Sequence, residues 1–171
     1  MTRAGLVVAD VGPEVIAVDM PLPRVLGAST VRVSGVDFTG TIASCGNPNL
    51  VCAVPDPDPL DLAGVPVLDP AVFPAGANVE FVAREPGAEP HVRMRVVERG
   101  VGETQSCGSG ACAVAAVVLA QSGQDSGTVT IDVPGGRLTV TLSPTRCILS
   151  GPAVIVATGT LAAPAPAYAL H

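Results

Sequence analysis

The residues best suited to chemistry in this sequence are a cysteine and the glycines that follow it, within the run ERGVGETQSCGSGAC at positions 98–112. Cys107 stands directly before Gly108-Ser109-Gly110 and an apolar segment typical of a helix. The first N–H groups of a helix lack intrahelical acceptors and lie at the positive end of its dipole, so they favour a thiolate and bind anions. The pattern therefore predicts that Cys107 is a nucleophile or a base.

A buried structural cysteine is the alternative interpretation of Cys107, since isolated cysteines are commonly buried. The glycines favour the chemical role, because Gly108 and Gly110 would let a ligand approach the backbone closely. A helix start that serves only structure would do as well with a Ser or Asp cap.

A carboxylate and a guanidinium, Glu98 and Arg99, precede a Gly100-x-Gly102 turn shortly before the thiol. Arginine is suited to bidentate capture of a carboxylate. A solvent-exposed ion pair at a strand end is the alternative for this dipeptide when it is taken alone.

Composition excludes several chemistries. All nine basic residues are arginine, and the net charge is −6. The absence of lysine excludes a Schiff base to pyridoxal phosphate and a Walker-type phosphate loop, and the acidic balance argues against nucleic acid and anionic membranes as partners. Of the two histidines, His91 and His171, only His91 lies within the predicted domain, so a histidine-based metal site or catalytic triad is not expected.

The five cysteines are an odd number without any Cys-x-x-Cys spacing, and we expect free thiols. The longest apolar run, Ala111–Ala120, is shorter than the roughly 18 residues that a membrane span needs. No signal-peptide pattern opens the chain. These features predict a soluble, cytoplasmic protein.

The elements that must position the thiol are many short strands and one helix. Val92, Met94 and Val96 alternate with Arg93 and Arg95, which is typical of a half-buried strand. The pattern of residues 111–121 predicts a helix that ends before Gly123. The helix is apolar on all sides, so we expect every side of it to be buried. The other expected strands are 6–9, 15–19, 30–33, 38–43, 50–54, 78–82, a 128–133/137–142 hairpin and 153–158.

The pattern predicts a single α+β domain over residues 1–160, in which a mixed sheet or barrel wraps around one buried central helix. Residues 55–59 alternate Pro and Asp and are expected to form a surface turn. The Ala/Pro segment 161–171 is expected to be a loose tail.

Taken together, four segments resemble diaminopimelate epimerase, the cofactor-independent enzyme of lysine and peptidoglycan precursor synthesis. They are residues 98–112, Gly46-Asn47-Pro48, the stretch from Phe73 to Val79, and Gly151-Pro152-Ala153. Their order and spacing also match that family. The resemblance covers roughly residues 15–159 and implies one half of the epimerase fold.

The resemblance implies that the α-carbon is inverted by two cysteines on opposite faces of the substrate, of which Cys107 is one, without a metal or other cofactor. Glu98 would modulate the proton affinity of the thiol and contact the substrate. Gly108 and Ser109 would hold the reacting carboxylate. The far end of diaminopimelate would be held by Arg99, Asn47 and Asn78.

Two departures from the family pattern concern the second cysteine. The chain matches only the C-terminal half of the family and has no second Cys-Gly-Asn-Gly motif. Asn49 also replaces the histidine that serves the other half's cysteine in the family. Cys45 is not expected to be the second acid, because it precedes an apolar strand instead of a helix.

Three hypotheses therefore stand. The first is a C-terminal half of an epimerase that interconverts LL- and meso-diaminopimelate and gains its second thiol from an N-terminal half or a homodimer partner. The second is a related racemase or isomerase with another substrate, and the third is a catalytically dead carboxylate-binding domain. The polar far-end residues favour the first over the second.

Overall fold

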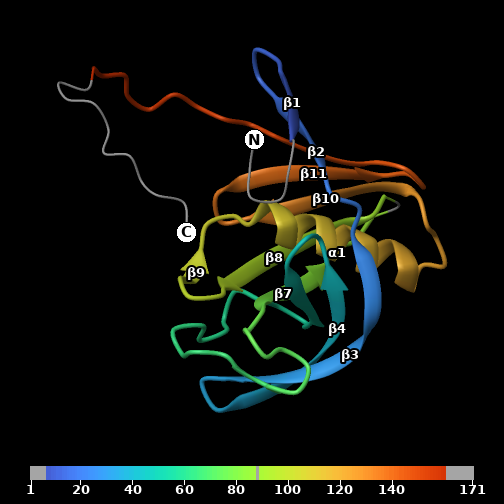
Figure 1. The fold of residues 1–171 in the computed structure, drawn as a ribbon, viewed down its shortest axis with the longest axis vertical. Helices are drawn as coiled ribbons and strands as arrows, with labels where there is room; N and C mark the ends of the chain where they lie inside the picture. Colours follow the sequence, from blue (N-terminus) through green and yellow to red (C-terminus); the bar gives the residue numbers. More distant parts are fainter. Residues whose placement is uncertain (1–6, 88, 161–171) are drawn as a thin grey trace.

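A computed structural model describes residues 7–87 and 89–160 as twelve strands and one helix (Figure 1). The helix is α1 (Gly108–Gln121). The strands are β1 (Val8–Val11), β2 (Ile16–Met20), β3 (Arg24–Val33), β4 (Val36–Ser44), β5 (Pro48–Ala53), β6 (Val67–Leu68), β7 (Asn78–Arg84), β8 (His91–Glu98), β9 (Gly102–Thr104), β10 (Gly127–Val133), β11 (Gly136–Leu142) and β12 (Cys147–Gly151).

The strands form one mixed sheet in the order β1-β2-β12-β11-β10-β8-β7-β5-β4-β3-β6, with β9 paired to β8. The pairs β5–β7 and β8–β10 are parallel, and the other pairs are antiparallel. The sheet curves around α1, so the predicted mixed sheet about a buried helix is confirmed (Figure 1). The barrel is not confirmed: within the described residues β1 and β6 end the sheet and do not pair, so the sheet is open.

Helix α1 begins at Gly108, three residues before the predicted start at Ala111. Its predicted burial is confirmed, since nine of its residues from Gly110 to Leu119 are buried. They pack against strands from both halves of the sheet order, β4, β5 and β7 on one side and β10, β11 and β12 on the other. The predicted stop is also confirmed: Gly123 follows the helix with φ of 71°, a left-handed conformation that favours glycine.

A second apolar cluster, which includes Leu50, Phe73 and Phe81, lies on the other face of β5 and β7. Alternate residues of β7 and β8 therefore face either α1 or this cluster. The alternation predicted for β8 is confirmed, because Val92, Met94 and Val96 are buried and the intervening arginines are partly exposed.

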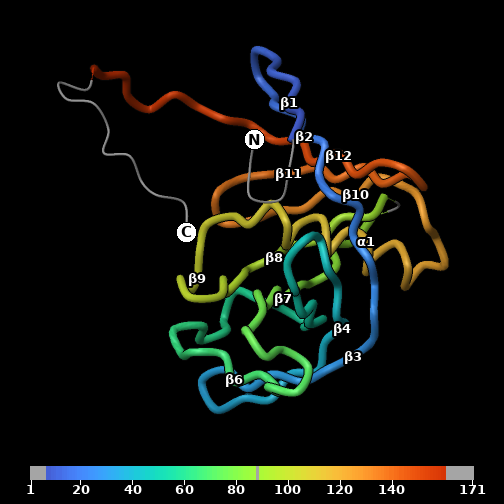
Figure 2. Tube along the Cα trace, viewed as in Figure 1, coloured from blue at the N-terminus to red at the C-terminus, as the bar shows by residue number. Residues whose placement is uncertain are grey.

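The predicted last strand, residues 153–158, is wrong. The strand lies earlier, at Cys147–Gly151, where both of its edges pair, with β11 and with β2. Residues 152–160 have strand-forming side chains but form no strand, and their trace leaves the sheet as an extended segment (Figure 2). Val154, Ile155 and Val156 are 81–94% exposed. The expected tail, 161–171, lies outside the described residues, as does Leu6 of the first expected strand.

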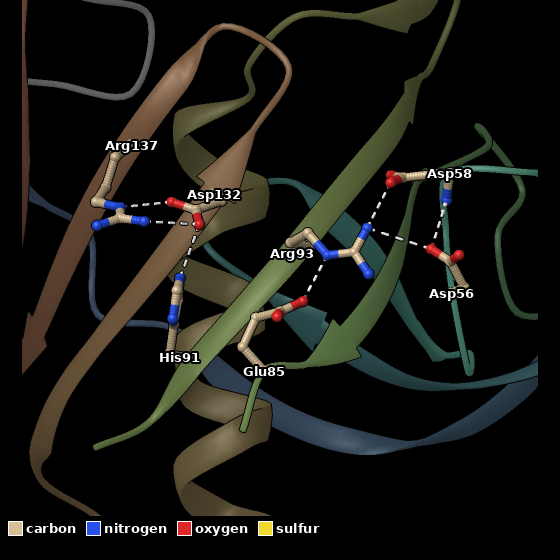
Figure 3. Close-up of polar contacts among 7 residues, drawn as sticks. All are labelled: Asp56, Asp58, Glu85, His91, Arg93, Asp132 and Arg137. Carbon is tan, nitrogen blue, oxygen red and sulfur yellow. Dashed lines mark hydrogen bonds and ion pairs between the residues drawn. The ribbon is translucent and has the colours of Figure 1, made fainter. Parts of the chain in front are cut away.

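Charged side chains fix the predicted surface turn at residues 55–59 to the sheet (Figure 3). Arg93 of β8 binds Glu85 and the turn carboxylates Asp56 and Asp58. Arg95 donates to three backbone carbonyls of the same loop, those of residues 57, 58 and 60. The turn is therefore part of the domain and not a linker.

His91 lies at the opposite end of β8 from Glu98 and pairs with Asp132 at 2.8 Å (Figure 3). A strand of this length separates its two ends by about 23 Å, so this histidine is remote from the residues near Cys107. Within residues 7–87 and 89–160, the structure has no helix long and apolar enough to cross a membrane.

Candidate active site

Cys107 is the N-cap residue of α1, with φ −133° and ψ 110°, and its carbonyl accepts the N–H of Ala111 at 2.9 Å to start the helix. The N–H groups of Gly108, Ser109 and Gly110 precede that first helical bond and therefore have no acceptor within the helix. No side chain caps them within the described structure, and the first turn carries no acidic residue. The helix start thus has N–H donors that no acceptor within the helix satisfies, and such groups favour an anionic partner.

An amide network holds the thiol from the side of the sheet. Asn78, the first residue of β7, places Nδ2 3.7 Å from Cys107 Sγ and donates from the same nitrogen to Asn49 Oδ1 at 3.2 Å. Asn78 Oδ1 accepts the backbone N–H of Arg99 at 3.0 Å. Asn49 in turn donates to the carbonyl of Asn47 at 2.9 Å. The ends of β5, β7 and β8 are thereby tied together beneath the thiol.

Burial raises the pKa of the Cys107 thiol, which is 6% exposed. The nearby hydroxyl of Ser109, at 3.6 Å, and the Gly110 N–H lower this pKa, whereas the carboxyls of Glu98 and Glu80 raise it further. The helix start therefore acts in the predicted direction, but loss of hydration outweighs it. Cys107 is held as a thiol at neutral pH, which suits the donation of a proton.

The structure brings most of the predicted site residues into one region. Glu98 ends β8 on the face toward α1, and its Oε1 accepts the hydroxyl of Thr104 at 2.6 Å. Arg99 extends outward, with its Nη1 donating to the carbonyl of Ala75 at 3.2 Å. Asn47 lies in the β4–β5 turn, where Gly46 has φ of 83° and lets the chain reverse.

The interpretation of the two glycines changes. A Cβ at Gly108 would lie 3.0 Å from Leu149 Cδ2, and one at Gly110 would lie 2.7 Å from Glu80 Oε1 and 3.3 Å from Cys107 Sγ. Protein atoms therefore already occupy the space beside both glycines. They permit close packing of α1 on the sheet, and the ligand approach inferred from the sequence is not required to explain them.

Asn49 and Glu80 belong to this region and were missed by the sequence analysis. Asn49 stood there only as a departure from the family pattern, yet it is fully buried and joins Asn47 to Asn78. Glu80 was part of an expected strand with no stated role, and it is also fully buried. A charged residue at an inward position of a strand is the signal that would have identified Glu80.

A cavity of about 560 Å³ adjoins Glu98 and Arg99, between the loop 62–68 and residues 97–103. Cys107 does not line it. The residues of the β8–β9 turn line this cavity. It therefore lies next to Glu98 and does not enclose the thiol.

Of the five cysteines, we expect Cys107 to react fastest with iodoacetamide at neutral pH, because it is the most exposed thiol and lies at a helix start. The others are free and at most 4% exposed, and Cys45 donates to the carbonyl of Pro21 at 3.2 Å. Peptide mapping after limited labelling measures the order of reaction. Preferential labelling of Cys45 or Cys147 would contradict the expectation.

Solved structures share this fold at low sequence identity. A PhzF-family phenazine biosynthesis protein from Bacillus anthracis has a TM-score of 0.59 at 13% identity, over 85% of this chain and 61% of that protein. A hydroxyproline epimerase from Agrobacterium vitis has a TM-score of 0.58 at 16% identity, over 87% and 54% respectively. At such identities the likeness establishes the fold alone.

Curated sequences are much more similar. Diaminopimelate epimerase of Rhodococcus jostii is 45% identical over 152 residues, which cover 85% of this chain and 52% of that protein. The enzyme of Acidothermus cellulolyticus is 47% identical, over 94% and 54%, and that of Corynebacterium glutamicum 41%, over 92% and 60%. The chain thus spans about half the length of the curated relatives it matches. Because the family model for diaminopimelate epimerase matches residues 41–160, and the relatives agree with it, the chain belongs to the diaminopimelate epimerase family.

Proposed function

We propose that this chain contributes one of the two thiols that interconvert LL- and meso-diaminopimelate, without pyridoxal phosphate or any other cofactor. The observation that carries the proposal is Cys107 at the N-cap of α1, beside three N–H groups that have no acceptor in the helix. The family to which the chain belongs supplies the substrate and the reaction, which serves lysine biosynthesis.

In the proposed mechanism, the α-carboxylate of the substrate binds the N–H groups of Gly108 and Ser109. Negative charge that develops when the α-proton leaves is then stabilised by fixed donors and by the positive end of the helix dipole. The sulfur of Cys107, which directly precedes Gly108 and Ser109, faces the α-carbon and exchanges a proton with it.

The remaining site residues are proposed to tune the thiol and to hold the substrate. Glu98 acts on the proton affinity of the thiol and contacts the substrate. Arg99, exposed at the rim, and Asn47 are proposed to hold the distal polar end of diaminopimelate. Asn78, which lies beside the thiol, is proposed to contact the substrate while it orients Cys107 Sγ.

Inversion needs an acid on each face of the α-carbon, and the other cysteines of this chain are unsuited to the second role. Cys45, Cys112 and Cys147 pack in the apolar cluster around α1, and Cys52 packs in the cluster on the other face of the sheet. We therefore propose that the second thiol comes from an N-terminal half, as in the family pattern, or from Cys107 of a second copy.

We expect the purified 171-residue chain to invert no diaminopimelate at a rate comparable to its relatives, because one thiol cannot serve both faces. The measurement is loss of the α-proton signal in deuterated buffer, followed by separation of the stereoisomers. Addition of the N-terminal half of the Rhodococcus jostii relative is expected to restore turnover. Inversion by the chain as a strict monomer in sedimentation would contradict the proposal, whereas activity of a dimer would identify the second copy as the source.

Substrate binding separates the alternatives. Diaminopimelate binding with turnover after addition of the N-terminal half supports the epimerase, and binding without turnover indicates a binding domain. Absence of diaminopimelate binding in that mixture would indicate a related isomerase with another substrate.

A further inference from the structure

Glu80 is a buried carboxyl that the proposed mechanism does not use. It lies in the middle of β7, pairs with Val96 of β8, and faces the first turn of α1. Its exposure is 0%, and within the described structure neither of its side-chain oxygens has a hydrogen-bond partner. A carboxylate in such a place would lose its hydration, and burial raises the pKa of Glu80 more than its own backbone N–H lowers it, so the protonated form is favoured.

Glu80 and Cys107 meet at Gly110. The position that a Gly110 Cβ would occupy lies 2.7 Å from Glu80 Oε1 and 3.3 Å from Cys107 Sγ. Both groups therefore lie within about 6 Å of each other, the range in which ionisable groups shift one another's pKa. Because Gly110 has no side chain, nothing at that position separates the carboxyl from the thiol.

Within residues 7–87 and 89–160, the ionisable groups whose pKa is coupled to that of Glu80 are acids. Glu98 of β8 raises the pKa of Glu80, and Glu80 raises that of Cys107 at the start of α1. On β5, burial and Glu80 raise the pKa of Cys52 to about 12. The guanidinium of Arg99 is directed to the carbonyl of Ala75, so it does not offset this group of acids.

We propose that Glu80 and Cys107 form a coupled acid pair across Gly110, in which the carboxyl keeps its proton whenever the thiol is ionised. Glu80 is thus a positioning residue: it does not touch the substrate, and it sets how readily Cys107 gives up its proton. This inference rests on the proposed catalytic role of Cys107.

The pair holds one negative charge at most, because two charges this close in a buried site repel strongly. Ionisation of either group therefore suppresses ionisation of the other. Above neutral pH the charge is divided between carboxylate and thiolate, which keeps part of Cys107 protonated and available as a proton donor.

The test is the pH dependence of Cys107 alkylation in the 171-residue chain, compared between wild type and Glu80→Gln. The variant keeps the size of the side chain and removes its charge. We expect Cys107 of Glu80→Gln to follow a single ionisation and to react about fivefold faster at its midpoint, which corresponds to a pKa lower by about one unit. In the wild type we expect a broader profile, because two groups share the titration. Glu14→Gln, at an exposed position, is the matched control and should leave the profile unchanged.

Superimposable profiles of wild type and Glu80→Gln would overturn the pair and would leave the role of Cys107 untouched. A second measurement needs only the wild-type chain: the infrared C=O band of a protonated carboxylic acid should persist at neutral pH. Its titration should move to lower pH when Cys107 is alkylated, since the competing ionisation is then removed. An acid band that is absent at neutral pH, or that alkylation leaves unchanged, would also overturn the pair.

Discussion

Replacement of Cys107 by serine is expected to lower epimerisation by at least about 10²–10⁴-fold, the usual contribution of a positioned acid or base. The measurement uses the chain reconstituted with the N-terminal half of a relative. A serine hydroxyl occupies nearly the same space but is a far weaker acid than a thiol, so it does not exchange a proton at the α-carbon. Binding of diaminopimelate is expected to change little, because the proposed carboxylate contacts are the N–H groups of Gly108 and Ser109.

Cys45→Ser is the matched control for this experiment. Cys45 is 4% exposed, and a serine there can still donate to the carbonyl of Pro21. Its turnover should stay near that of the wild type. Equal turnover by Cys107→Ser and wild type would exclude Cys107 as the acid, whereas loss of binding along with turnover would indicate that the variant had disturbed the helix start.

Glu80→Gln is expected to change the pH dependence of stability more than any other carboxyl substitution in the chain. Burial raises the pKa of Glu80 well above its ordinary value of 4.5 in the folded protein, while the unfolded chain ionises near that value. Between these two pKa values the folded state binds one proton more than the unfolded state. Unfolding free energy therefore falls by about 1.4 kcal/mol for each pH unit of increase.

The penalty begins as pH rises through the unfolded pKa and grows until the pH reaches the raised folded pKa. A glutamine at position 80 has no such ionisation, so its unfolding free energy should stay nearly level over the same window. Urea unfolding at several pH values measures both curves. Glu14→Gln, at an exposed position, should retain the wild-type slope. Parallel curves for Glu80→Gln and wild type would mean that Glu80 is ionised in the folded protein.

The sequence by itself determined the elements and their chemistry where the signal is local. Alternation of apolar and charged residues placed β8, and an apolar run ending at Gly123 placed a helix buried on every side. Cys107 before a glycine-rich helix start, with Glu98 and Arg99 upstream, predicted the thiol, and this run together with three further segments carried the resemblance to the family. These features depend on periodicity and on a short motif, which neighbours along the chain specify.

Only the tertiary structure decided which strands find partners and what surrounds the thiol. Residues 153–158 have the composition of a strand, but Cys147–Gly151 forms the strand instead, because β2 and β11 lie on either side of it and hydrogen-bond to it. The sheet stayed open because β1 and β6 do not meet within the described residues.

The acidity of Cys107 was decided in the same way. The helix start favours the thiolate, as its sequence position predicts, but the packing of α1 against β7 buries the sulfur and brings Glu80 and Glu98 near it. Asn49 and Asn78, which are 29 residues apart, meet there because β5 and β7 are parallel neighbours in register. Burial and long-range pairing depend on the whole fold. A short sequence motif therefore predicts which group is reactive but not the pKa of that group.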